Sequence, residues 1–120
     1  MSKRIPDTNI DLMLDIVEGT NIQVCSAEPT TFAEATTTFN LASDVVGSYS
    51  KANGDTSGRK NTQAGTTDSN ITSTGTATHI AVTTTTGSVL EIVTTCTPQA
   101  LTSGGTVTVG PFDHEIGDAT

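Results

Sequence analysis

The chain has 120 residues and a formal net charge of −8 at pH 7, and its five basic residues all lie in the first half. This length is enough for one domain with a small core. Apolar residues make up 33% of the chain, below the usual value of about 45%, so we expect partners to add stability. Beyond the first six residues, Arg59-Lys60 is the only pair of adjacent basic residues. Nucleic-acid binding needs a cluster of basic residues, so we expect no nucleic-acid partner.

Threonine is the commonest residue, and the chain has no tryptophan and a single tyrosine. Threonine is β-branched and disfavoured in helices, so this composition predicts a mainly β fold. No stretch approaches the roughly 18 apolar residues of a membrane span, and residues 1–20 lack the continuous apolar segment of a secretory signal. We expect synthesis in the cytoplasm and no membrane partner.

The first six residues are predicted to form an extended basic arm. Lys3 and Arg4 give this arm its charge, and Pro6 favours extended geometry at Ile5. An extended basic segment of this kind is suited to lying along another protein. We therefore treat residues 1–6 as separate from a single β-rich domain over residues 7–120.

A short helix is predicted over residues 8–18, at the start of that domain. Thr8 and Asp11 have the spacing of a capping box, and Gly19 is expected to end the helix. The apolar positions recur with helical spacing and predict one buried face. They are Ile10, Met13, Leu14 and Val17.

The rest of the chain predicts strands and turns. Residues 22–27 alternate as a strand, residues 32–35 could form a helical turn, residues 36–41 and 45–49 resemble short strands, and residues 51–57 resemble a loop. Residues 76–82 and 88–95 flank a turn and predict a hairpin. Residues 104–109 and 112–116 predict a last strand pair, or one strand bent at Gly110-Pro111. The spacing favours a small antiparallel β-sandwich or barrel.

Residues able to carry chemistry are few. The segment 54–60 has the wrong spacing for a phosphate-binding loop. On a strand, Asp113 and Glu115 point to one face and His114 to the other, so these three side chains cannot converge on one metal ion. A metal site would also need His79. A cysteine nucleophile with one of these histidines is conceivable, but Cys25 and Cys96 have no flanking base and are expected to be free thiols. We predict no enzyme, no catalytic residue, no cofactor and no metal site.

The chain resembles a family of small virion structural proteins of tailed bacteriophages, and the resemblance spans nearly its whole length. The segments that carry it are an Ile-Pro-Asp opening at residues 5–7 before an apolar helix, VCSAEPTTFAEA at 24–35, GRK at 58–60, GTATH at 75–79, ALTSGGT at 100–106 and FDHEI at 112–116. One departure is Ile80, where the family pattern has an aromatic residue beside His79.

The resemblance implies a virion component without catalysis. Small size, acidity and β content favour a decoration, or cement, protein on the outer surface of the phage head, whose partners are the major capsid protein and other copies of itself, often as a trimer. The residues expected at the partner interface are Lys3, Arg4, Ile5, Pro6, Arg59 and Lys60. The alternatives are a neck, tail or fibre-attachment protein, a carbohydrate- or receptor-binding β-module, and a small hydrolase.

Overall fold

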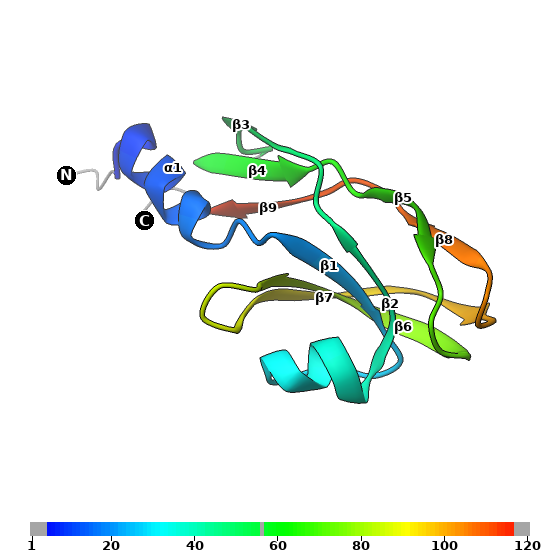
Figure 1. The fold of residues 1–120 in the computed structure, drawn as a ribbon. Coiled ribbons are helices and arrows are strands. Elements are labelled where there is room, and N and C mark those ends of the chain that lie inside the picture. The colour runs from blue at the N-terminus through cyan, green and yellow to red at the C-terminus, as the bar shows by residue number, and fades with distance from the viewer. Residues whose placement is uncertain (1–4, 56, 117–120) are drawn as a thin grey trace.

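The computed structural model describes residues 5–55 and 57–116. It confirms the predicted mainly β fold with one short N-terminal α-helix and antiparallel sheets (Figure 1). The molecule is elongated, with principal extents of 56 × 26 × 22 Å. The elements are α1 (Asp7–Ile16), β1 (Asn21–Cys25), a π-helical segment (Glu34–Thr38), β2 (Asn40–Val45), β3 (Tyr49–Asn53), β4 (Arg59–Gln63), β5 (Thr66–Asn70), β6 (Gly75–Thr84), β7 (Val89–Leu101), β8 (Thr106–Val109) and β9 (Phe112–Ile116).

One layer is a four-stranded antiparallel sheet in the order β2-β1-β6-β7. Its inner face carries β-branched and aliphatic side chains in register, such as Ile22 beside Val82 and Val24 beside Ile80, and these belong to the main hydrophobic core. The hairpin of β6 and β7 confirms the prediction for the two segments around residues 83–87. The central strand β1 is buried on both faces, because its four residues from Ile22 to Cys25 all lie inside.

The second layer consists of a three-stranded sheet, β3-β4-β9, and a two-stranded sheet, β5-β8. The chain passes from β4 to β5 through Ala64-Gly65 and from β8 to β9 through Gly110-Pro111, so the two sheets follow one another. Gly65 has φ +76°, and a Cβ there would lie 2.1 Å from the Val109 carbonyl oxygen, so this bend requires glycine. The strands β8 and β9 pair with β5 and β4 and not with each other, so the predicted direct pairing is wrong. They are two strands of different sheets that follow one another across the bend at Gly110-Pro111.

The two layers are joined along one side. Ala42 forms an isolated antiparallel bridge with Ile71, just beyond β5, and the Thr72 amide donates to the Leu41 carbonyl at 2.8 Å. These contacts tie β2 of the first layer to the β5 end of the second. The opposite edges, β7 and the β8–β9 bend, therefore lie together on the other side of the sandwich.

Helix α1 differs from its prediction in bounds and in capping. It runs over Asp7–Ile16 and begins after Pro6, without a side-chain cap, because proline fits the start of a helix where no amide partner is needed. The predicted capping box is therefore wrong. Of the predicted buried face, Ile10 and Leu14 are fully buried, whereas Met13 is 36% exposed.

A π-helical segment, Glu34–Thr38, replaces the first part of the predicted strand over residues 36–41, and the strand β2 begins only at Asn40. The Thr30 amide and hydroxyl both donate to the Glu34 carboxylate, at 2.8 and 2.6 Å, and these bonds lower the pKa of Glu34. The Thr36 hydroxyl donates back to the Phe32 carbonyl at 2.8 Å. Local threonine hydrogen bonds of this kind compete with strand formation. The segment lays Ala35 against the outer face of β1 and β6.

Two further predictions need correction. The predicted loop over residues 51–57 begins as part of β3, which extends to Asn53. The predicted strand over residues 45–49 is not a strand of its own: Val45 ends β2, Tyr49 begins β3, and residues 46–48 connect them. The physical reason is the backbone pairing of β3 with β4. Polar and charged residues form such backbone hydrogen bonds as well as apolar residues do.

Candidate functional site

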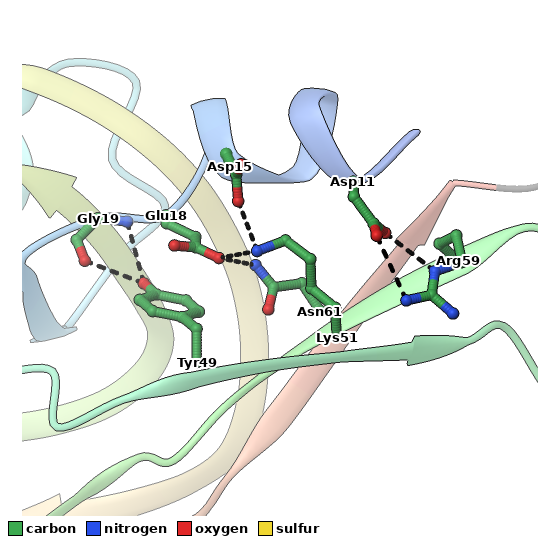
Figure 2. A network of polar contacts seen from close by, with 8 residues as sticks. All are labelled: Asp11, Asp15, Glu18, Gly19, Tyr49, Lys51, Arg59 and Asn61. Atoms are coloured by element: carbon green, nitrogen blue, oxygen red, sulfur yellow. Dashed lines mark hydrogen bonds and ion pairs between the residues drawn. The ribbon is translucent and has the colours of Figure 1, made fainter. Parts of the chain in front are cut away.

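A network of ion pairs and hydrogen bonds fastens α1 to the second layer (Figure 2). Arg59 on β4 holds the Asp11 carboxylate with two donors, Nε to Oδ1 at 2.9 Å and Nη2 to Oδ2 at 3.3 Å. Lys51 on β3 contacts Asp15 and donates to Glu18 Oε2 at 2.9 Å. These partners, Asp15 first, raise the pKa of Lys51. We call this set the α1 clamp.

The clamp continues to the residues that follow the helix. The Tyr49 hydroxyl accepts from the Gly19 amide at 2.9 Å and donates to the Gly19 carbonyl at 3.0 Å. Burial of the ring raises the pKa of Tyr49. A Cβ on Gly19 would lie 2.4 Å from Val82 Cγ1 and 2.7 Å from the Thr83 carbonyl oxygen, so the close approach to β6 requires glycine.

The predicted interface residues fall into separate places. Lys3 and Arg4 lie outside the described residues, and Pro6 is exposed immediately before α1 while Ile5 is half-buried. Arg59 belongs to the α1 clamp. Lys60 contacts Asp55 at 2.7 Å and Asp113 at 3.6 Å. Of the four bases that the sequence placed at a partner interface, the two that the structure describes, Arg59 and Lys60, are thus engaged within the chain.

Three polar side chains from β4 and β9 line the inside of the second layer. The residues Asn61 and Gln63 are 0% and 1% exposed, and the ring nitrogens of His114 are buried. The Asn61 amide donates to Glu18 at 2.7 Å. Its oxygen, both amide atoms of Gln63 and both His114 nitrogens have no hydrogen-bond partner among the described residues. We call these three residues the inner polar row. Sequence reasoning singled out His114 but missed Asn61 and Gln63, because burial of β4 has no local signal.

His114 lies opposite Asn61 in the β4–β9 register. As predicted for a strand, its neighbours Asp113 and Glu115 are exposed while His114 turns inward. Burial lowers the pKa of His114, against the opposing effects of Asp113 and Glu18. A neutral imidazole is therefore favoured in the folded protein.

The cysteines are free thiols, as predicted. Cys25 stands opposite His79 in the β1–β6 register, but its thiol donates to the Ala35 carbonyl at 3.7 Å. Burial raises the pKa of Cys25 to about 11, which disfavours the thiolate that nucleophilic catalysis needs. His79 Nδ1 contacts the Thr78 hydroxyl at 2.8 Å. Within residues 5–55 and 57–116, no group of three or more His, Cys, Asp or Glu is placed to hold a metal ion.

A cleft of about 450 Å³ opens between β7 and the β8–β9 bend, on the side where the two layers are not joined. This volume lies within the range of roughly 300–1,000 Å³ that ligand clefts have. Its lining is apolar or uncharged and includes Phe112 and the half-buried Cys96. The lining residues are Val24, Ala77, Ile80, Thr94, Thr95, Cys96, Thr97, Gln99, Leu101, Val107, Thr108, Val109, Gly110 and Phe112.

Comparison of the chain with protein-family models, with curated proteins and with solved structures finds no match. Among the described residues, no helix is long and apolar enough to cross a membrane.

Proposed function

We propose that this protein is a non-enzymatic structural component of a phage virion, a decoration protein that binds the outer surface of the capsid as an oligomer and stabilises the head. The resemblance in the segments 24–35, 58–60, 75–79, 100–106 and 112–116 supports the virion assignment. A trimer at a symmetry point of the shell is the expected form.

The observation that carries this proposal is the uncovered apolar side of α1. Leu12 is 58% exposed and Ile16 is 73% exposed, and Met13 lies between them at 36%. The buried positions Ile10 and Leu14 already anchor the helix on β4 and β9. Large apolar side chains on the other side contribute nothing to that packing, and exposed apolar surface of this kind marks protein contacts. The predicted arm, residues 1–6, directly precedes this helix in the sequence, so we propose that arm and helix contact the capsid together.

The charges support a protein partner. Each basic residue that the structure describes, Lys51, Arg59 and Lys60, pairs with a carboxylate of the same chain. The surface of the domain is consequently left with the excess of negative charge, which disfavours nucleic acid. Lys3 and Arg4 remain as the bases proposed to contact the capsid.

The alternative of a carbohydrate-binding module has less support. Sugar platforms use aromatic faces, and the single tyrosine, Tyr49, is half-buried with its hydroxyl bonded to Gly19. The phenylalanines Phe32, Phe39 and Phe112 are also half-buried.

The test is binding to purified shells of the parent phage that lack this protein. The wild-type chain should occupy many sites over the shell and raise its melting temperature. The double variant Leu12→Ser with Ile16→Ser should bind at least tenfold more weakly while its own folding is unchanged. Val89→Ser, at a 43% exposed position in the β6–β7 hairpin, is the matched control. Copies confined to a ring at the portal would support the neck or tail alternative, and no binding to any part of the particle would refute a virion role.

A further inference from the structure

The cleft beside β7 lies between strands whose outer edges have no partner strand. In the part of the chain that the structure describes, β7 pairs only with β6, β8 only with β5, and β9 with β4. The bridge between Ala42 and Ile71 closes the far side of the sandwich, so these unpaired edges border the open side. An edge strand presents backbone donors and acceptors that a further strand can satisfy.

The lining of the cleft selects for an uncharged occupant. No Asp, Glu, Lys, Arg or His is among its residues, although the chain carries a net charge of −8. Burying a charged side chain against Val107, Val109 and Leu101 would leave that charge without a partner, which is costly. An extended segment with small apolar side chains fits both the lining and the unpaired edges.

A buried amide, Gln63, lies behind the cleft lining and is not itself one of the lining residues. It lies opposite Phe112 in the β4–β9 register, so the two side chains are neighbours on the inner face, and Phe112 lines the cleft. The Gln63 side chain is 1% exposed, and both its amide oxygen and its amide nitrogen have no partner among the described residues. One acceptor beside one donor pair is the pattern that another amide complements.

We propose that this cleft binds an extended, uncharged segment of a partner polypeptide by strand addition along β7 or the β8–β9 edge, with an amide of that segment pairing with Gln63. The proposed function enters only in naming the source of the segment, a capsid subunit. A second copy of this chain is disfavoured at the same edge, because both copies carry a net negative charge. A small apolar molecule would leave both strand edges unpaired.

The binding test uses a blocked synthetic peptide, acetyl-Thr-Val-Asn-Val-Thr-Val-amide, and two analogues in which alternate backbone amides are N-methylated in either register. We expect the parent peptide to bind with a dissociation constant below about 1 mM, to shift amide resonances of β7 and β8, and to slow their hydrogen exchange. At least one methylated analogue should bind tenfold more weakly. Absence of binding at this concentration, equal binding of all three peptides, or binding on another face would overturn the proposal. Preferential binding of an apolar small molecule such as decanol would show a hydrocarbon pocket instead.

Variants of the chain sharpen this test. Gln99→Glu places a charge at the exposed rim of the cleft and should weaken peptide binding at least tenfold, whereas Thr86→Glu adds the same charge in the exposed hairpin turn and should leave binding unchanged. Gln63→Leu should weaken binding about tenfold without lowering the melting temperature, because a buried amide without partners is removed. Unchanged binding by Gln63→Leu would refute the role of Gln63.

A thiol readout separates this proposal from the proposed function. Cys96 lines the cleft and Cys25 is buried, so iodoacetamide should label Cys96 in the free protein and label it at least tenfold more slowly on the shell. Peptide binding without shell binding would leave the cleft assignment standing and refute the decoration role. Shell binding with Cys96 still reactive, together with no peptide binding, would leave the decoration role standing and refute the cleft assignment.

Discussion

The α1 clamp and the inner polar row share strand β4 but satisfy their polar groups differently. In the clamp, Arg59 on β4 holds the Asp11 carboxylate. In the inner polar row, Asn61 uses only its amide nitrogen, on Glu18, and Gln63, two residues further along, has no partner among the described residues. Buried polar groups are normally paired, and each exception requires an explanation. The comparison indicates that the basic residues facing α1 are paired within the chain, whereas the Gln63 amide lacks contacts that a partner can supply.

The largest expected effect is that of Leu14→Ala, which tests how α1 packs on the second layer. Leu14 is fully buried beneath α1, and removing a core leucine side chain costs about 2–5 kcal/mol. Chemical denaturation should show this loss. The matched variant Leu12→Ala, at a 58% exposed position of the same helix, should change stability by less than about 0.5 kcal/mol. Equal stability of the two variants would show that this face does not anchor the helix.

Gly19→Ala tests the close approach between the end of the clamp and β6. The added Cβ would overlap Val82 and the Thr83 carbonyl, and overpacking of this kind costs about 1–3 kcal/mol. The control is Gly47→Ala, where nothing lies within 4 Å of the added atom, and its stability should stay within about 1 kcal/mol of the wild type. Thermal melts of both variants measure the difference, and a neutral Gly19→Ala would contradict the described approach.

Lys51→Met removes the cation shared by Asp15 and Glu18 while keeping most of the aliphatic stem. We expect a loss of about 1 kcal/mol, the upper end for a partly exposed ion pair. Because the pKa of Lys51 is raised above 10.5 in the folded chain, this contribution is fully present below that pH and is lost as the pH rises through the folded-state pKa. Denaturation at pH 7 and pH 11 should therefore show a difference between variant and wild type that shrinks at the higher pH. A difference that is the same at both pH values would argue against the ion pair.

A variant of His114 tests the inner polar row and has the smallest expected effect on stability. Its pKa is lowered from 6.5 by burial, so the unfolded chain binds the proton more readily. The stability contribution is present above pH 6.5 and decreases as the pH falls toward the folded-state pKa. His114→Gln should remove this part of the pH dependence between pH 7 and pH 5. Retention of the full dependence, or an NMR titration of His114 above pH 6.5, would contradict the buried neutral ring.

Local patterns were sufficient for the elements that short-range interactions determine. Threonine content predicted the mainly β fold, the spacing of Ile10 and Leu14 predicted the helix, and the turn at residues 83–87 predicted the hairpin of β6 and β7. A glycine-bearing turn brings those two strands together over a short chain distance. The bend at Gly110-Pro111 was also visible, because proline and glycine limit the backbone at that position alone.

Only the tertiary structure decided which strands pair over long distances and which polar side chains become buried. Arg59 and Lys60 are read from the sequence as free bases, yet pairing with Asp11 and Asp55 depends on where α1 and the residue 54–58 turn come to rest. Likewise, Gln63 and Asn61 lie in a polar segment that predicts exposure, and only the packing of β4 between β3 and β9, beneath α1 and the first layer, places them inside. Sequence periodicity reports the faces of one element, whereas burial depends on the elements that fold against it.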